Sequence, residues 1–484
     1  MTPQLKLAIL LILTTVIITA CGDNSDTDTI QNPPANNPIT LTILAPNKYT
    51  NFIRSVGRNM QAQFAEQRID FNIELTDYDL TDDFAVLRHN ETLQIMLMAG
   101  EGYDIVFLNW IPQNIRSFAE NGFLLNVYDL IDQDPNLTRD DFFTNVFAAL
   151  EHRGGLYSFP FSFGFDFVGI NATLPNSFLN DFMQKNSISL LEIMNLLNAL
   201  KSEHPEIYAS FQYNSNIQAL YFHSVALTSV ASDFIDFDNA TSLFNTIEFV
   251  NILTTIQNTV PMANLYMYSN QDNLFFAFET VADMNRMAEQ NILLGIFRRH
   301  MSFSNLTPFF PSQNEQFLNF IPIADHNGKL LLNTEISTSH TFARVIFPAL
   351  SDGIVAWDFT QQLMHRMINS TSSTLNGGFF GNSVFVIPIL RSELEPHFNR
   401  VMQAVENDVR EFHFGTQAEI AANRAAALAK ITELADSPVS IIDRNSVNFF
   451  WDGDLFNSFM LGVITAEDLA QEVHNRASLW LLGG

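Results

Sequence analysis

Residues 39–109 alternate between strand and helix patterns, and this order constrains the fold more than any other feature of the chain. Three short apolar runs are typical of strands: Ile39–Pro46, Ile69–Tyr78 and Tyr103–Asn109. Two segments with helical spacing separate them: Asn51–Gln67 and Asp83–Gly100. A strand–helix–strand–helix–strand order predicts a parallel sheet that presents ligand sites at the carboxyl ends of its strands. Those ends include Ala45–Pro46 and Asn109–Trp110.

The rest of the chain predicts further α/β structure in a second lobe. A chain of 484 residues is too long for one ordinary core, and 47% apolar residues exclude wholesale disorder. Helical patterns occur at Ser189–Pro205, Glu248–Val260, Ile354–Ile368 and Glu419–Asp436. Short strands are expected at Asn319–Asp325 and Ser383–Pro388. The formal charge of −28 argues against nucleic acid or an anionic lipid surface as a partner.

The N-terminus has the pattern of a secretory signal. Lys6 precedes a short apolar run, Leu7–Ala20, and Cys21 follows it. Cys21 is the one cysteine in the sequence, so an intrachain disulfide and a cysteine metal cluster are excluded. "IITAC" resembles a bacterial lipobox, which predicts a signal peptide over residues 1–20 and a lipid on Cys21; the alternative is an uncleaved anchor helix. Gly22–Pro38 is polar and reads as a disordered tether.

Phenylalanine occupies every second position in part of the segment Ser158–Asn171, "SFPFSFGFDFVGIN". Side chains alternate across a strand, so the five rings from Phe159 to Phe167 are expected on one packed face. The other face carries Ser162, Gly164 and Asp166. We expect these residues to face a binding site, with Phe163 packed behind them. The alternative is a strand buried on both faces.

Several segments together resemble extracellular solute-binding protein family 1, the carbohydrate-type, lipid-anchored receptors of ABC importers. The segments, in order, are Gly102–Phe142, Gly154–Asn171, Phe234–Leu253, Ala356–Met364 and Gly462–Leu481. Ile170 departs from the family, which usually has an aromatic residue there. The resemblance implies two α/β lobes joined by crossing strands, with a solute bound in the cleft and a hinge that closes over it.

The resemblance also implies where the chain crosses between lobes. Crossings are expected near Phe165–Asn171, near Ile321–Asp325 and after Pro388. The N-terminal lobe would then hold residues 39–166 and 325–388, and the C-terminal lobe residues 167–324 and 389–484. The implied partners are a small solute, expected to be a sugar or oligosaccharide, and the permease subunits of an importer. A monomer on the extracellular face of the membrane is expected.

Candidate ligand-binding residues come from the strand ends and from positions matching the family's segments. Asn109 could bind hydroxyl groups and Trp110 could stack on a sugar face; the alternative is a helix cap and a packed indole. Direct carry-over of the family's polar contact fails at Gly164. The full set is Asn109, Trp110, Ser162, Phe163, Gly164, Asp166, Tyr213, Asn214, Glu279, Gly378, Phe379 and Trp451. Gly378 could let the backbone approach a ligand closely, or it could only form a turn. Trp451 could instead be a core residue.

The sequence offers little support for catalysis or metal binding. Asp452 and Asp454 are close in sequence, but nothing marks them as an acid and base facing each other across a substrate. Asp132–Asp140 begins like a calcium loop but lacks its glycine and its final glutamate. A polar lead into a helix capped by Thr138 or Asp140 is the favoured interpretation. No cofactor or metal is expected, although a peptide receptor or a surface glycosidase or adhesin remains an alternative.

Overall fold

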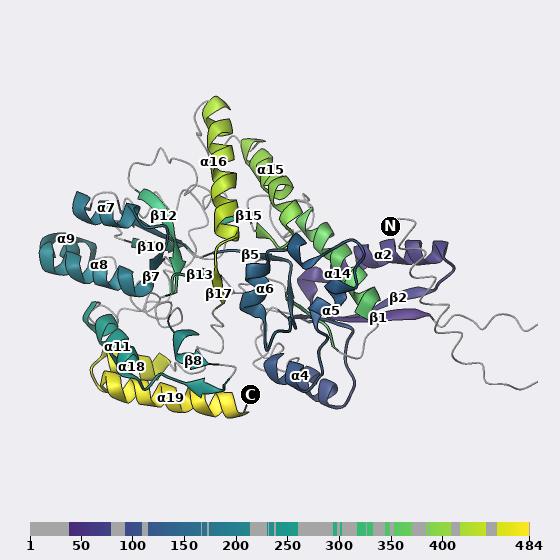
Figure 1. The fold of residues 1–484 in the computed structure, drawn as a ribbon, viewed down its shortest axis with the longest axis horizontal. Coiled ribbons are helices and arrows are strands. Elements are labelled where there is room, and N and C mark those ends of the chain that lie inside the picture. The colour runs from purple at the N-terminus through teal and green to yellow at the C-terminus, as the bar shows by residue number, and fades with distance from the viewer. Residues whose placement is uncertain are drawn as a thin grey trace, which may run out of the picture.

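The computed structural model describes the chain in the following ranges: 38–78, 92–108, 115–165, 167–171, 174–212, 230, 232–236, 239–259, 294–297, 301–302, 317–325, 327–332, 344–348, 353–369, 384–385, 387–407, 417–441 and 453–483. These residues form mixed sheets covered by helices (Figure 1). The cores divide them into two lobes, which are defined below.

The first sheet has the strand order β2-β1-β3-β14-β4. Its strands are β1 Ile39–Pro46, β2 Phe71–Tyr78, β3 Ile105–Leu108, β4 Phe159–Pro160 and β14 Arg344–Ile346. β1 pairs parallel with both β2 and β3, which confirms the parallel unit expected from residues 39–109. β14, from a distant part of the chain, runs antiparallel to β3 and β4.

Alternation along β1 divides the apolar residues between the two faces of this sheet. Leu41, Ile43 and Ala45 join the largest core, while Leu44 joins a smaller one on the other face. The larger core packs against α2 Thr50–Glu66, α5 Val127–Asp132 and α14 Gly353–Ile368. The smaller core packs against helical residues 92–98 and α4 Ile115–Glu120. A sheet covered on both faces explains why its central strand β3 is an apolar run.

The second sheet has the order β10-β6-β12-β13-β17, with β7 beside β12. Its strands are β6 Phe167–Asn171, β7 Ile188–Ser189, β10 Leu294–Phe297, β12 Phe317–Ala324, β13 Leu330–Leu332 and β17 Val439–Ile441. The helices and hairpin around it are α7 Asn176–Met183, α8 Leu190–Glu203, α9 Pro205–Gln212, η3 Ser232–Phe234, β8 Ile235–Asp236, β9 Thr241–Ser242, α11 Ile247–Thr259, α18 Gly453–Met460 and α19 Ala466–Gly483. α8 begins where the sequence predicts, because Ser189 and Glu192 form a capping box.

The remaining elements belong with the first sheet. They are η1 Asn47–Tyr49, η2 Arg139–Asp141, α6 Thr144–Leu150, β5 Ser162–Phe163, β15 Val384–Phe385, β16 Ile387–Pro388, α15 Arg391–Asn407 and α16 Gln417–Ala435. β11 Met301–Ser302 pairs with β15, and β16 pairs with β5. The strand expected over residues 383–388 is therefore two short strands with different partners.

Buried residues of the second sheet alternate between two cores. Phe167 belongs to the core of the first sheet, and Val168 to the core around α8, α11 and α19. We call the parts around these cores the first and second lobe. Ile323 and Leu331 belong to the second core, whereas Ala324, Leu330 and Leu332 belong to the first, so β12 and β13 contribute side chains to both. β6 and β12 pair antiparallel, with Phe167 opposite Pro322, so the two crossing strands are hydrogen-bonded to each other.

The two helices that follow Pro388, α15 and α16, contribute to the first core. Residues of α15 and α16, including Phe398 and Ile431, are fully buried in the core of the first lobe. The second core resumes only at Phe456 in α18. The expected bounds of the C-terminal lobe, residues 167–324 and 389–484, stay a prediction. Helical periodicity predicts an apolar face, but it does not say against which sheet that face packs.

Candidate functional site

The carboxyl ends of four strands meet at one edge of the first sheet. Pro46 lies opposite Tyr78, and the register of β1 with β3 brings Leu108 to the same level. Arg344 of β14 pairs with Leu108 on one side and with Pro160 on the other. In an open α/β sheet this edge is where ligands bind. Asn109 and Trp110 follow Leu108 directly, but they lie outside the described residues.

Among the described side chains at this edge, the Asp77 carboxylate is an exposed acceptor. The Thr50 hydroxyl donates to Asp77 Oδ2 at 3.2 Å, and Asp77 itself is exposed. The Tyr78 hydroxyl donates to the carbonyl oxygen of Phe107 at 2.9 Å in a buried contact. Tyr49 is 1% exposed, and its burial raises the pKa of its hydroxyl well above the usual value. The two tyrosines are therefore scaffold, while the Asp77 carboxylate can accept hydrogen bonds from a bound molecule.

The segment that crosses between lobes is packed on its aromatic face, as predicted. Phe159, Phe161 and Phe163 are fully buried, and Phe165 and Phe167 are 4% and 2% exposed. Neighbouring rings meet edge-on; the centroids of Phe163 and Phe165 are 5.8 Å apart. The segment is not one strand, however. β4, β5 and β6 pair with β14, β16 and β12 respectively, so the chain passes from sheet to sheet in a few residues.

The opposite face of this segment is only partly open. Ser162 is 1% exposed, so it does not face open solvent as expected, because β5 is covered where it pairs with β16. Gly164 is partly exposed, and a Cβ built on it would meet no atom of the described residues within 4 Å. Of the candidate residues that the structure describes, Gly164 is therefore the one that borders free space, and Phe163 packs beneath it.

Most other candidates lie outside the described residues. These are Cys21, Asn109, Trp110, Asp166, Tyr213, Asn214, Glu279, Gly378, Phe379 and Trp451. The structure thus brings together Ser162, Phe163 and Gly164, which are also adjacent in sequence. Across the described ranges, no three His, Cys, Asp or Glu side chains gather closely enough to hold a metal ion.

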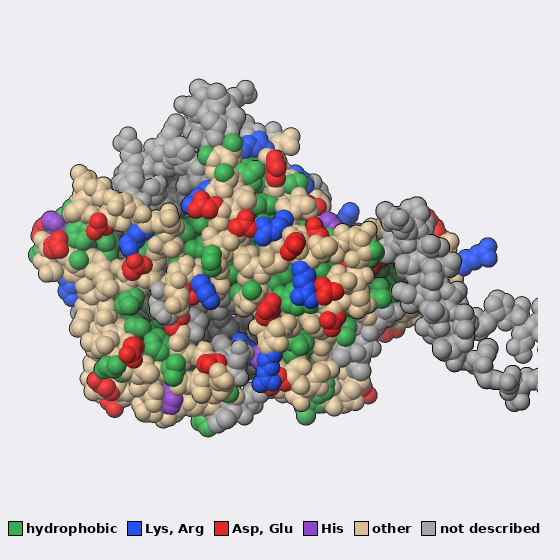
Figure 2. All heavy atoms as spheres, in the orientation of Figure 1, with side chains coloured by type: hydrophobic (Ala, Val, Ile, Leu, Met, Phe, Trp, Pro, Cys, Tyr) green, Lys and Arg blue, Asp and Glu red, His purple; other side chains and the backbone are tan. Residues whose placement is uncertain are grey.

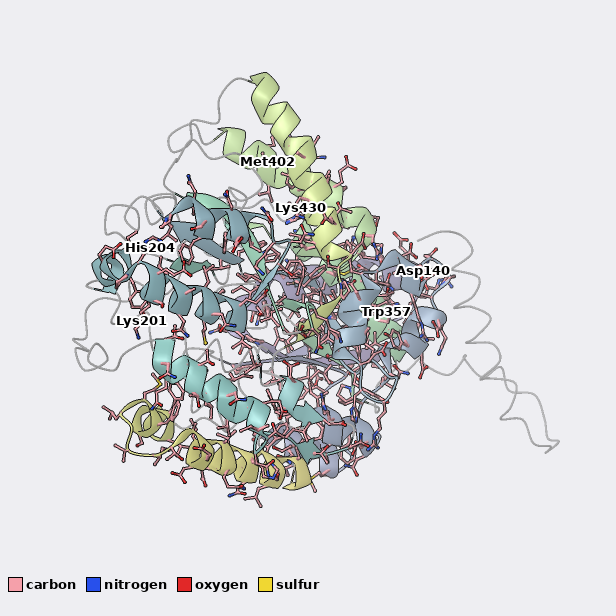
Figure 3. All side chains as sticks on the ribbon, turned by 60° about the vertical axis from the view of Figure 1, so that its left-hand side comes forward. Asp140, Lys201, His204, Trp357, Met402 and Lys430 are labelled. Atoms are coloured by element: carbon pink, nitrogen blue, oxygen red, sulfur yellow. The ribbon has the colours of Figure 1, made fainter. Side chains whose placement is uncertain are left out.

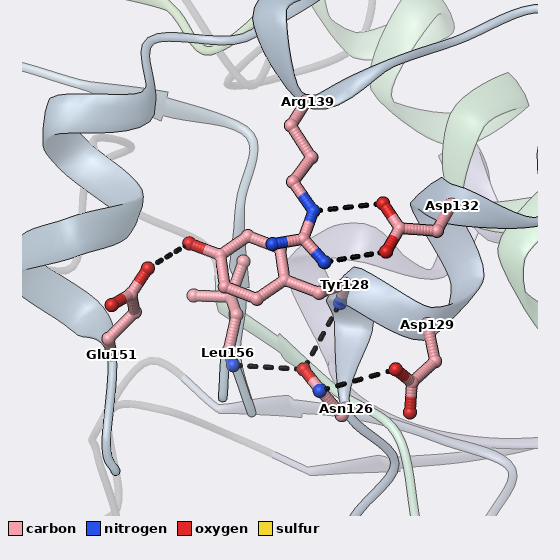
Figure 4. A network of polar contacts seen from close by, with 7 residues as sticks. All are labelled: Asn126, Tyr128, Asp129, Asp132, Arg139, Glu151 and Leu156. Atoms are coloured by element: carbon pink, nitrogen blue, oxygen red, sulfur yellow. Dashed lines mark hydrogen bonds and ion pairs between the residues drawn. The ribbon is translucent and has the colours of Figure 1, made fainter. Parts of the chain in front are cut away.

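In the acidic segment Asp132–Asp140, which resembles the start of a calcium loop, side chains bind other residues of the protein. The Arg139 guanidinium donates to both oxygens of Asp132, at 2.8 and 2.6 Å, and lowers the pKa of that carboxyl (Figure 4). Thr138 donates from its backbone and hydroxyl to Asp141 Oδ2, at 2.7 and 2.9 Å. Thr138, not Asp140, is therefore the residue that caps the following turn.

Sequence reasoning missed the polar network around Tyr128. Its hydroxyl donates to Glu151, and burial, together with this hydrogen bond, raises the pKa of Tyr128. The Arg139 guanidinium lies 4.0 Å from the centroid of its ring. Asn126 Oδ1 accepts from the backbone of Tyr128 at 3.2 Å and of Leu156 at 3.0 Å (Figure 4). An Asn directly before a short apolar helix was the one signal available, since it is a preferred cap.

A second missed contact joins this segment to α14. The indole of Trp357 donates to Asp134 Oδ2 at 2.8 Å, and Trp357 and Asp140 both lie in the first lobe (Figure 3). Lys201 and His204, by contrast, are at the end of α8 in the second lobe. On the face shown in Figure 2, basic and acidic side chains stand next to one another over α5, α6 and α15. Ion pairs such as Arg391 with Asp436, at 2.5 Å, account for this mixture.

Solved structures of similar shape are known. The sugar-binding protein MalE from Xanthomonas citri matches with a TM-score of 0.51 and 12% identity, over 92% of this chain and 97% of that one. A protein from Synechococcus sp. MITs9220, assigned as an oligosaccharide periplasmic-binding protein, matches with a TM-score of 0.50 and 13% identity, over 91% and 99%. No family model and no curated protein matches the sequence. At this identity the likeness concerns the fold: the chain has the two-lobed α/β fold of periplasmic solute-binding proteins.

Proposed function

We propose that the chain is a solute-binding receptor of an ABC importer and that its solute is a sugar or oligosaccharide. The observation that carries the proposal is the pair of cores joined by the hydrogen-bonded crossing strands β6 and β12. This architecture extends over nearly the whole length of two solved proteins, one named as sugar-binding and one assigned to oligosaccharides. Two lobes joined this way can rotate about the crossing and enclose a solute.

The chemistry at the carboxyl edge of the first sheet is compatible with a polyhydroxylated solute. Hydroxyl groups donate hydrogen bonds, and Asp77 is an exposed acceptor at the strand ends. Gly164 leaves space beside the crossing segment. We propose that the solute lies between these two places, with Asn109 and Trp110 following β3 beside it. The other candidates, Asp166, Tyr213, Asn214, Glu279, Gly378, Phe379 and Trp451, remain proposed contacts.

The proposed role is binding and delivery rather than catalysis. The lipobox-like segment supports a lipid anchor on Cys21, which would hold the protein at the extracellular face of the membrane beside the permease. None of the helices in the described ranges is long and apolar enough to span a bilayer. The two solved proteins of similar fold are named for binding, which supports the same role.

A thermal-shift panel tests the proposal. A solute present at a hundred times its Kd adds about 2.7 kcal/mol to the free energy of unfolding and raises the melting temperature. The panel should contain mono- and oligosaccharides in one arm and short peptides in the other. Sugar-specific shifts are expected. Shifts from peptides alone would overturn the carbohydrate assignment, and a flat response in both arms would overturn the receptor proposal.

A pair of variants locates the site. Gly164→Leu should abolish the sugar-dependent shift because its side chain fills the space beside the crossing segment. Thr241→Leu changes an exposed residue of the β8–β9 hairpin in the second lobe and should leave the shift unchanged. Equal shifts in both variants would place the solute elsewhere.

A further inference from the structure

A buried histidine lies where α15 packs against α14, beside a carboxylate that already has two basic partners. The oxygens of Glu393, on α15, are 3.3 Å from His365 Nδ1 of α14 and 3.7 Å from Arg400 Nη2. His397 lies on α15 between Glu393 and Arg400 and is 4% exposed. A proton on His397 would therefore add a positive charge at a place that water does not reach.

The elements packed around this junction do not balance that charge. Burial, followed by the charge of Arg400, lowers the pKa of His397 to about 4, and none of the described carboxylates contributes to the shift. The strands β15 and β16 carry no titratable side chain. The titratable side chains of the helices are Asp358, His365 and Arg366 on α14, Arg391, Glu393, Glu395, Arg400 and Glu406 on α15, and Glu419, Arg424, Lys430 and Glu433 on α16.

The backbone of α15 has a weak point next to His397. Pro396 lies inside the helix and has no N–H to donate to the carbonyl oxygen of Ser392. The first turn of α15 is therefore joined to the rest by one helical hydrogen bond fewer. His397 itself lies beside the backbone of Ile368, the last residue of α14. Separation of the two helices would thus bring its imidazole into water.

We propose that this junction is an acid-sensitive latch, in which α15 separates from α14 when His397 takes up a proton, while the central strands of the first sheet stay paired. In the separated state the imidazole is hydrated and binds a proton as an ordinary histidine does. In the packed state it stays neutral. Acid therefore favours separation, by up to about tenfold for each pH unit below 6.5, until about pH 4. Local opening of this kind needs less free energy than unfolding of the whole lobe.

Hydrogen exchange measured by mass spectrometry on the whole chain tests the latch. Protection factors, which correct for the intrinsic effect of pH on exchange, are compared at pH 7 and pH 5 for peptides from α15 and from β1. In the wild type the protection of α15 should fall by about 20-fold between the two pH values. At pH 5 it should also be lower than the protection of β1, because β1 opens only when the lobe unfolds.

Three variants identify the group that takes up the proton. His397→Gln should abolish the pH-dependent fall in α15. Arg400→Gln should reduce the fall without abolishing it, because burial of His397 remains. His152→Gln is the matched control, since His152 is also buried in the first lobe, at 6% exposed, but lies 2.9 Å from the Glu120 carboxylate. This control should leave the fall in α15 unchanged.

Two results would overturn the latch. One is equal protection of α15 and β1 at pH 5, which would mean that α15 opens only with the whole lobe. The other is a fall of the wild-type size in both His397→Gln and Arg400→Gln. The latch rests on the packing of the first lobe and is measured without solute, so a flat thermal-shift panel would reject the proposed function and leave the latch standing.

Discussion

His397 should make the first lobe sensitive to acid. It lies on α15, is 4% exposed, and burial, with a smaller contribution from Arg400, lowers its pKa from 6.5 to about 4. An unfolded chain protonates this imidazole near pH 6.5, whereas the folded chain keeps it neutral down to about pH 4. Because the unfolded state binds more protons in this window, the free energy of unfolding falls as the pH falls through it.

The size of the effect follows from the shift. A difference of one pKa unit corresponds to about 1.4 kcal/mol, so the free energy of unfolding should fall by about 3 kcal/mol between pH 6.5 and pH 4. Below about pH 4 both states are protonated, and the contribution of His397 no longer changes with pH. Above pH 6.5 both states are neutral and the contribution is also constant.

The contribution of His397 to the free energy of unfolding can be measured by urea denaturation of the wild type and of His397→Gln. Unfolding is followed by circular dichroism at several pH values between 7 and 4. The wild type should lose about 3 kcal/mol more than the variant across the window. Other titrating groups cancel in the comparison, including Asp358, whose pKa is raised by burial and which acts in the opposite direction. Parallel pH profiles for the two proteins would refute the reasoning.

Three further predictions concern the first lobe and are measured by the same urea denaturation at neutral pH. Phe161→Ala should cost about 3–5 kcal/mol because the ring is fully buried, whereas Gly164→Ala should stay within about 0.5 kcal/mol because its Cβ meets no atom within 4 Å. A cost below 1 kcal/mol for Phe161→Ala would contradict the packed face. Trp357→Phe should cost about 1–3 kcal/mol, since Asp134 loses the indole donor, and the cost should shrink in an Asp134→Asn background. Asn126→Ala should cost about 1 kcal/mol through loss of the α5 cap, and Asn126→Asp should restore most of it.

Local patterns predicted most elements of this fold but not how they associate. α14 and α11 begin and end within a residue or two of the expected ranges, because helical spacing and apolar faces are local properties. The aromatic face of residues 159–167 was also predictable from alternation. Alternation does not reveal the partner strand, however, so it could not show that Ser162 would be covered by β16.

The candidate site was less accessible to sequence reasoning than the fold. Trp357 and Asp134 are 223 positions apart, and nothing local links them. The packing of α15 and α16 on the first lobe likewise depends on tertiary contacts. The order of elements along the chain does not reveal which core a helix packs against, and the expected lobe bounds stay a prediction.

The interleaving of the two cores has a consequence for how the protein is made. The Asn145 amide donates to the carbonyl oxygens of Ala435 and Ser437, at 2.8 and 2.6 Å. A segment synthesised early therefore forms these hydrogen bonds only after residues 435–437 have been synthesised. Val439 is a buried residue of the first core, and Val473 and Ala477 are buried residues of the second. Neither lobe can therefore finish folding while the ribosome is still adding the last fifth of the chain. Such long-range closure favours slow folding and leaves apolar surface exposed in the nascent chain. A chaperone that holds the chain unfolded until synthesis ends would suit this topology.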